Sequence, residues 1–270
     1  MESEVTKNYL QKLFVRKIFG EKMYRRFKVL KIYLMYLLRK NYEISDFLEK
    51  LISTDFIIMD IGANLGQYLL RFHRLIKNNG KVYSFEPVEE NFKILNTLKN
   101  LLHLNSAEII RLALSNYNGE SVLYIPLLES SIELDTQATI NLDNYKGVKD
   151  NFRKELVKVS TIDDIVEKLG ITRLDLIKSD TEGNDYKVIE GGLKTVKRFR
   201  PFIFIEENHK ATWLKSLFDL EYKPYYVVNN NILKPAELVT EFDNANYDLM
   251  ALIPREKIER INQLVINNVN

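Results

Sequence analysis

The feature that most constrains the fold is a regular alternation of short apolar runs with helical segments between residues 56 and 253. Continuous apolar runs such as residues 56–61 are typical of strands that are buried on both faces of a parallel sheet. The intervening segments, such as residues 66–76 and 88–101, have the apolar spacing of amphipathic helices. Strands that alternate with helices predict a three-layer α/β domain with a mostly parallel sheet.

The same patterns predict the individual elements. Strands are expected at residues 56–61, 81–85, 108–114, 121–125, 174–179, 202–206, 224–228 and 247–253, and helices at 66–76, 88–101, 161–169, 185–198 and 211–220. Thr161 is expected to cap its helix. The polar stretch 128–150 interrupts the alternation, and we interpret it as an inserted loop region that covers a site. Its polar side chains, among them Gln137 and Asn141, suit a hydroxyl-rich acceptor.

Residues 1–50 form a separate, basic helical extension in this interpretation, and residues 51–270 form the α/β domain. Residues 1–40 contain eleven Lys and Arg and three Glu, a net charge of 11 − 3 = +8, so the rest of the chain carries 2 − 8 = −6. Apolar residues recur at helical spacing on both sides of Gly20, and a further helix is expected at 45–51. We expect an amphipathic helical pair that packs on the domain, touches an anionic membrane or mediates self-association.

The composition excludes several classes of site and of location. The chain has no cysteine, which excludes disulfides, zinc–thiolate sites and a cysteine nucleophile, and it has only three histidines. No run approaches the roughly 18 apolar residues that a membrane-spanning helix needs, and no signal-peptide cleavage site follows the apolar run Ile32–Leu38. We therefore expect a cytoplasmic protein, peripheral to a membrane at most.

The first strand leads into a glycine loop with an acid in front of it. The loop, residues 60–66, has the sequence DIGANLG, and Glu86 ends the second strand. A carboxylate at that place can accept hydrogen bonds from both ribose hydroxyls. Loops that bind dinucleotides use three glycines around a pyrophosphate, whereas Asp60 would repel phosphate and suit an amine. S-adenosylmethionine has an amine, a sulfonium and no phosphate, and it is the cofactor that this pattern predicts.

Three ordered segments carry a family resemblance: residues 60–68 (DIGANLGQY), 85–87 (FEP) and 176–183 (LIKSDTEG). Together with the supporting segments 114–119, 161–164, 188–192 and 201–207, they resemble the FkbM family of class I S-adenosylmethionine-dependent methyltransferases. The resemblance covers roughly residues 56 to 253. Ser179 and Thr181 stand where the family usually has aliphatic residues. The resemblance implies a Rossmann-like, seven-stranded sheet with one antiparallel strand, for which residues 247–253 are the candidate.

The resemblance also implies methyl transfer to oxygen, often on a sugar hydroxyl of a glycan or natural product. We expect the cofactor to be bound by residues at the carboxyl ends of the first three strands and by one later acid: Asp60, Gly62, Ala63, Asn64, Gly66, Tyr68, Glu86, Ala113, Leu114, Ser115 and Asp180.

A hydroxyl must lose its proton in such a reaction, so a base or a cation is expected beside it. In a metal-free mechanism, Glu182 or His209 takes the proton, and Asp180 is a further catalytic candidate. In a metal-dependent mechanism, oxygen atoms hold Mg²⁺ or Mn²⁺ at the ends of two strands. The candidate ligands are Asp180, Glu206, Glu207 and Asn208.

Other functions stay open at this point. The acceptor can be a small natural product or a nitrogen atom, and the chain can be a non-catalytic methyltransferase-like module that binds a partner through its basic extension. A nucleic-acid acceptor is not expected, since the chain after residue 40 carries −6 by the arithmetic above and lacks the Asn/Asp-Pro-Pro-aromatic motif of base methylation.

Overall fold

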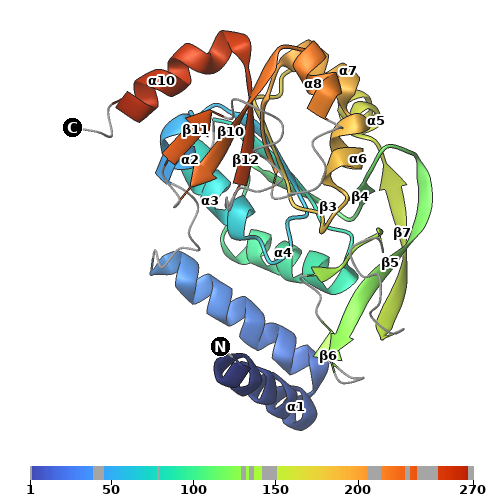
Figure 1. The fold of residues 1–270 in the computed structure, drawn as a ribbon. Helices are drawn as coiled ribbons and strands as arrows, with labels where there is room; N and C mark the ends of the chain where they lie inside the picture. Colours follow the sequence, from blue (N-terminus) through green and yellow to red (C-terminus); the bar gives the residue numbers. More distant parts are fainter. Residues whose placement is uncertain are drawn as a thin grey trace.

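A central sheet of eight strands organises the structure, a computed structural model that describes residues 2–38, 46–77, 79–128, 132–133, 137–141, 151–205, 214–228, 232–235 and 249–266. The strand order is β11-β10-β12-β9-β8-β1-β2-β3. Figure 1 labels β10, β11 and β12 at one side of this sheet. In chain order these strands are β1 (Ile57–Ile61), β2 (Lys81–Phe85), β3 (Ala107–Ile110), β8 (Leu176–Ser179), β9 (Phe202–Ile205), β10 (Tyr222–Val228), β11 (Ile232–Pro235) and β12 (Leu249–Pro254).

The sheet is mostly parallel, as the sequence predicts. Strands β3, β2, β1, β8 and β9 pair in parallel, whereas β12 is antiparallel to both of its neighbours, β9 and β10. Strand β12 is therefore the one antiparallel strand among the seven from β3 to β10, which confirms the expectation for residues 247–253. Strand β11 forms an antiparallel hairpin with β10 and adds an eighth strand at the edge that the sequence analysis does not predict.

Helices cover both faces of the sheet because successive strand residues point to opposite sides. Ile58 and Leu176 join one apolar core, and their neighbours Met59 and Ile177 join the other. The first face is covered by α2 (Asp46–Leu51), α3 (Gln67–Ile76), α4 (Glu89–Leu101) and α10 (Ile258–Ile266), of which α10 is not predicted. The second face is covered by α5 (Ile162–Lys168), α6 (Asp185–Glu190), α7 (Leu193–Phe199) and α8 (Lys215–Asp219).

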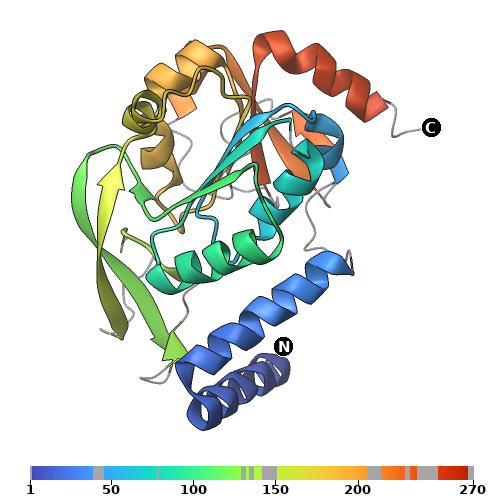
Figure 2. The ribbon, with the colours of Figure 1, turned by 180° about the vertical axis from the view of Figure 1, so that it is seen from behind.

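A second sheet stands beside the first, in the order β4-β7-β5-β6. Its strands are β4 (Ala113–Leu114), β5 (Gly119–Leu128), β6 (Ile132–Glu133) and β7 (Phe152–Ser160), and Figure 2 shows β5 and β7 as a long antiparallel ribbon at one side of the domain. The prediction of one strand at 108–114 is wrong in this respect: β3 ends at Ile110, and β4 pairs with β7 in the second sheet.

Two helix boundaries can be explained by particular residues, a glycine pair and a threonine cap. The helix predicted at 185–198 is divided into α6 and α7 at Gly191-Gly192, and a Cβ at Gly191 would lie 2.2 Å from the carbonyl oxygen of Ser115. The predicted cap of α5 is confirmed, since the hydroxyl of Thr161 accepts a hydrogen bond from the amide of Asp164 at 3.1 Å.

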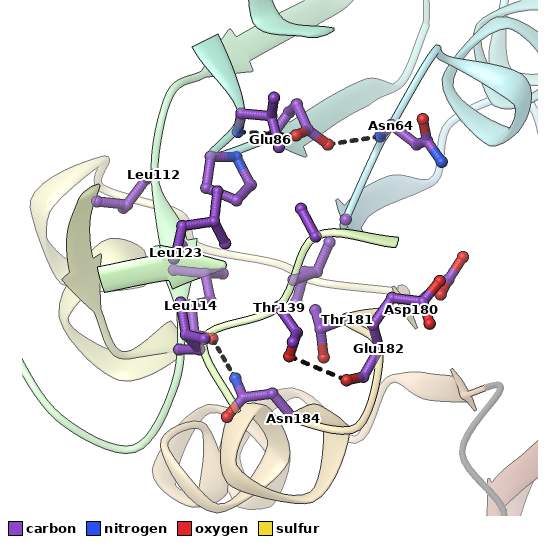
Figure 3. Close-up of a pocket in the computed structure, with 17 residues that line it drawn as sticks. Asn64, Glu86, Leu112, Leu114, Leu123, Thr139, Asp180, Thr181, Glu182 and Asn184 are labelled. Carbon is purple, nitrogen blue, oxygen red and sulfur yellow. Dashed lines mark hydrogen bonds between the residues drawn. The ribbon is translucent and has the colours of Figure 1, made fainter. Parts of the chain in front are cut away.

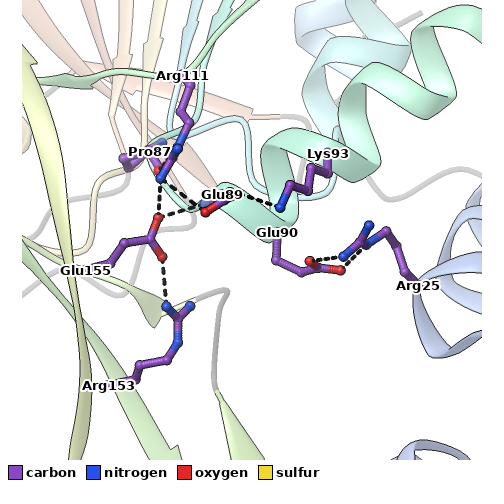
Figure 4. A network of polar contacts seen from close by, with 8 residues as sticks. All are labelled: Arg25, Pro87, Glu89, Glu90, Lys93, Arg111, Arg153 and Glu155. Carbon is purple, nitrogen blue, oxygen red and sulfur yellow. Dashed lines mark hydrogen bonds and ion pairs between the residues drawn. The ribbon is translucent and has the colours of Figure 1, made fainter. Parts of the chain in front are cut away.

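Helix α1 (Glu2–Leu37) forms the extension and is interrupted at Gly20, where φ is +73° and the backbone leaves helical geometry. Figures 1 and 2 both place α1 on the far side of α4 from the sheet. The guanidinium of Arg25 pairs with the carboxylate of Glu90 on α4, with 2.7 Å between Nη2 and Oε2 (Figure 4). On the other side of α4, Glu155 of β7 binds Arg111, Arg153 and the amide of Glu89, which ties the second sheet to the domain. Within the described part of the chain, no helix is long and apolar enough to cross a membrane.

Candidate functional site

A pocket lies where the carboxyl ends of β1, β2 and β8 face the second sheet (Figure 3). It has a cavity volume of about 50 Å³ and is partly open to solvent. The lining comes from the loops after these three strands, from residues around β4 and β5, and from the described part of the insertion. These residues are Ile61, Gly62, Asn64, Glu86, Pro87, Val88, Leu112, Ala113, Leu114, Leu123, Ala138, Thr139, Ile140, Asp180, Thr181, Glu182 and Asn184.

The glycine loop after β1 forms one wall of the pocket. The amide of Gly62 donates to the carbonyl of Phe85 at 3.0 Å, so the loop continues the contact between β1 and β2. Gly62 has a φ of +72°, and a Cβ at this position would lie 1.8 Å from the carbonyl oxygen of Asp180. Both observations require glycine here, because any side chain would separate the loop from the one that follows β8.

Glu86 stands next to this loop and is almost fully buried. Its Oε2 accepts a hydrogen bond from the amide of Asn64 at 2.7 Å, and its Oε1 accepts one from the amide of Val88 at 2.9 Å. A carboxylate offers about four lone-pair sites, so it can hold the loop and also accept hydroxyl groups from a ligand in the pocket.

The loop after β8 brings two carboxylates to the opposite wall. Asp180 accepts a hydrogen bond from the Nζ atom of the buried Lys178 at 3.1 Å. Glu182 has a φ of +52°, a left-handed conformation that is uncommon outside glycine. Burial, together with the negative charges of Asp180 and Asp185, raises the pKa of Glu182 to about 7. Glu182 therefore exchanges a proton near neutral pH.

The insertion docks on this same loop. Thr139 pairs with Tyr124 of β5 through two backbone hydrogen bonds of 2.8 and 3.0 Å. Its hydroxyl donates to the carbonyl of Glu182 at 3.0 Å, and the side-chain amide of Asn141 donates to the carbonyl of Gly183 at 2.8 Å. Residues 137–141 of the insertion therefore lie against the pocket.

Seven of the residues predicted from the sequence surround this one pocket: Gly62, Asn64, Glu86, Ala113, Leu114, Asp180 and Glu182. Asp60 does not line it. The side chain of Asp60 is wholly buried in the sheet, where it accepts a hydrogen bond from the hydroxyl of Ser84 at 3.3 Å, and burial raises its pKa to about 6. The contact between Asp60 and the cofactor amine thus stays a prediction.

Four other predicted residues also lie away from the lining. Tyr68 packs on Phe72, and the Nζ atom of Lys178 lies 4.3 Å from the centre of the Tyr68 ring. Ala63 is buried, Gly66 stands directly before α3, and the hydroxyl of Ser115 donates to the side chain of Asn184 at 3.4 Å. These residues support the loops that form the pocket.

Sequence reasoning missed several polar residues of the site. Asn184 lines the pocket, and its side-chain amide donates to the carbonyl of Leu114 at 2.9 Å, which joins the start of α6 to β4. Asp185 is buried and accepts hydrogen bonds from the hydroxyls of Ser179 and Thr181. The available signal was the segment directly after β8, residues 180–185, in which every residue except Gly183 is polar.

The remaining predicted residues, Glu206, Glu207, Asn208 and His209, lie outside the described residues. Within the residues that are described, no group of three acidic or histidine side chains is arranged to hold a metal ion. The metal-dependent and histidine-dependent mechanisms therefore stay predictions.

The charge of the pocket indicates what it can bind. Three carboxylates line it, and its described lining contains no lysine, arginine or histidine. Such a site disfavours phosphate and suits a cation. Pro87, Leu112 and Leu123 supply apolar walls for a flat ring, and Glu86 supplies an acceptor for hydroxyls. An adenosyl group that carries a sulfonium and an amine fits this set of residues.

Comparisons with known proteins agree with this chemistry. The family model described as "Methyltransferase FkbM domain" matches residues 60–248. The chain is 27% identical over 195 residues to the 2-O-methyltransferase NoeI of Sinorhizobium fredii (strain NBRC 101917 / NGR234), across 68% of this chain and 76% of that protein.

Two solved structures are also similar. Methyltransferase FkbM from Methylobacillus flagellatus KT has 15% identity and a TM-score of 0.47, and the match covers 74% of this chain but only 44% of that longer one. An O-methyltransferase from Bacillus cereus in complex with SAH has 12% identity and a TM-score of 0.42, with 90% of this chain and 97% of that chain covered.

Proposed function

Since the chain belongs to the FkbM family of S-adenosylmethionine-dependent methyltransferases, we propose that it methylates a hydroxyl of a saccharide or a similar polyhydroxylated acceptor. The name of the relative from S. fredii, a 2-O-methyltransferase, supports oxygen as the methylated atom. The observation that carries the proposal is the acidic pocket, in which Glu182 has a pKa near neutrality beside the loops that suit the cofactor.

The loop of Gly62 and Asn64 would hold the cofactor on one side, and Glu86 would accept the ribose hydroxyls. When bound, S-adenosylmethionine supplies a methyl carbon that its sulfonium activates toward attack. Asp180 and Glu182 provide the negative charge that favours the amine and the sulfonium. Leu112 and Leu123 line the pocket and would shield the adenine of a bound cofactor from water.

Glu182 takes the proton of the attacking hydroxyl in this mechanism. A carboxylate with a pKa of about 7 is a stronger base than an ordinary glutamate and is still largely deprotonated slightly above neutrality. Thr139 and Asn141 hold the backbone around Glu182, so the carboxylate keeps a fixed direction. Asp180 accepts hydrogen bonds from neighbouring hydroxyls, which a polyhydroxylated acceptor offers and a simple amine does not.

A divalent cation is the alternative means of activating the hydroxyl. It would need Asp180 together with the candidate ligands Glu206, Glu207 and Asn208. Asp180 already accepts a hydrogen bond from Lys178 through Oδ2, so a metal ion that needs direct coordination would compete with this ammonium group for the carboxylate. We therefore favour Glu182 as the base.

The test is a methyl-transfer assay with isotopically labelled S-adenosylmethionine and a panel of saccharides, small polyhydroxylated natural products and amines. Mass spectrometry then locates the methyl group. We expect O-methylated saccharide, a large loss of product in Glu182→Gln, and unchanged activity in Glu167→Gln, an exposed glutamate on α5. Product found only on nitrogen would refute the acceptor class, and full activity in Glu182→Gln would refute the base.

A further inference from the structure

The second half of α1 is apolar on two faces, and the domain covers only one of them. The inner face buries Val29 and Ile32 in the core that α4 shares, and the Arg25–Glu90 pair fixes this side (Figure 4). The outer face carries five large apolar side chains that are between 37% and 54% exposed: Met23, Phe27, Leu30, Leu34 and Leu37. A contiguous exposed apolar patch of this kind is typical of an interaction surface.

These five residues, which we call the outer stripe, follow each other at intervals of four and three residues. At 3.6 residues per turn this spacing places them in one nearly straight row along the helix. Lys22 and Arg26 lie along one margin of the row and Lys31 along the other, and all three side chains are exposed. The outer stripe therefore has positive charge on both sides.

A groove continues the outer stripe toward α4. It has a volume of about 570 Å³ and combines the basic Lys22 and Arg26 with the apolar Leu30 of the stripe and the exposed Leu101 of α4. A groove that combines apolar and cationic side chains suits a lipid, which has an acyl chain and a phosphate.

We propose that the outer stripe docks on an anionic lipid surface, with α1 lying in the plane of the interface. Interfacial helices of this type insert an apolar face at the boundary of head groups and acyl chains, while flanking Lys and Arg side chains reach the phosphates. The charge of the flanks is complementary to anionic lipid.

A second copy of this chain fits the outer stripe less well. The four-three spacing is that of a coiled-coil seam, and the charged residues beside such a seam decide whether two helices pair. Arg26 and Lys31 occupy those positions, so two copies would bring positive charges together with no acid between them. Like charges in such pairs are destabilising. An anionic bilayer meets the same residues with the opposite charge.

The test measures co-sedimentation of the full-length protein with vesicles of phosphatidylcholine alone and of phosphatidylcholine with one third phosphatidylglycerol. We expect binding to the anionic vesicles, little binding to the neutral ones, and weakening as salt is raised. The double variant Phe27→Glu/Leu34→Glu should abolish binding. The matched control Leu156→Glu changes a leucine on β7 that is 64% exposed and should bind like the wild type.

A second variant keeps the apolar face and removes charge. Each Lys or Arg near an anionic surface changes affinity by about fivefold, so Arg26→Gln/Lys31→Gln should weaken binding by about 25-fold. This variant decides the question if Phe27→Glu/Leu34→Glu does not fold. Absence of binding to anionic vesicles, or equal binding to neutral ones, would overturn the proposal. A wild-type dimer in analytical ultracentrifugation that Phe27→Glu/Leu34→Glu converts to a monomer would also overturn it, because the occupant would then be a second copy.

Discussion

Replacing Thr139 by valine tests whether the insertion holds the catalytic loop. The hydroxyl of Thr139 shares its one proton between the carbonyls of Glu182 and Asn141, at 3.0 and 3.2 Å, and accepts a hydrogen bond from the amide of Asn141 at 3.0 Å. Valine has nearly the same shape but leaves these backbone groups without this partner. Thr139 is only 1% exposed, so water replaces the lost bonds poorly. The valine removes one donated and one accepted hydrogen bond, and each unsatisfied buried group costs about 1–3 kcal/mol, so the free energy of unfolding should fall by roughly 2–6 kcal/mol.

The same substitution should lower turnover. Glu182 adopts a left-handed backbone conformation, which costs about 1–3 kcal/mol and persists only where the surroundings hold it. Without the hydroxyl of Thr139, the carboxylate loses its fixed direction. A misplacement of about 1 Å can cost about 100-fold in rate. We therefore expect kcat to fall by about ten- to a hundredfold, while the affinity for S-adenosylhomocysteine changes little.

Urea denaturation and steady-state kinetics measure these effects. Thr139→Ser keeps the hydroxyl and should retain most of the stability and turnover, losing about 1 kcal/mol for one methyl group. The control Thr97→Val removes a threonine hydrogen bond of 2.8 Å on the exposed surface of α4 and should change neither stability nor turnover by much. If Thr139→Val unfolds at the wild-type urea concentration, or if the serine variant loses as much activity as the valine variant, the reasoning is refuted.

Three further predictions concern protons and metal. Turnover should rise as the pH passes about 7 and Glu182 loses its proton, and Glu182→Gln should remove this rise and lower kcat by about 10²–10⁴ in a pH–rate profile. The folded state raises the pKa of Asp60 from 3.8 to about 6. Folding therefore favours the protonated form of Asp60, and the free energy of unfolding should fall by up to about 3 kcal/mol between pH 4 and 6. Urea unfolding of Asp60→Asn at several pH values should not show this fall. Exhaustive chelation should leave both turnover and cofactor binding intact, whereas loss of turnover that Mg²⁺ or Mn²⁺ restores would favour the metal-dependent mechanism.

Local patterns were sufficient to predict the central sheet and the loops at its carboxyl edge. The buried strand before Gly62 and the acid that ends β2 lie on neighbouring parallel strands, so their ends meet in any fold of this class. The antiparallel last strand followed from the family resemblance. The pocket residues that belong to these loops were therefore predictable.

Residues joined over a long sequence distance were not predictable. Thr139 binds Glu182, 43 residues later, and no periodicity specifies that contact. Strand β7 was missed because charged side chains such as Lys154 and Lys158 occupy its exposed face and reduce its apolar content. The position of Asp60 depends on sheet register, which places it between Ser84 and Lys178 inside the core.

The central claim is that the acidic pocket holds S-adenosylmethionine, with Glu86 at the ribose. Isothermal titration calorimetry with S-adenosylhomocysteine tests it most directly, with NAD and ATP as competing ligands. Losing a charge-assisted hydrogen bond costs about 1.5–3 kcal/mol, so Glu86→Ala should weaken binding by about ten- to a hundredfold. Glu108→Ala, which removes a surface acid paired with Lys81, should bind like the wild type. We predict that the wild type binds S-adenosylhomocysteine tightly, that Glu86→Ala loses this affinity and that Glu108→Ala keeps it. Equal affinity in Glu86→Ala, or preferred binding of NAD or ATP, would contradict the assignment.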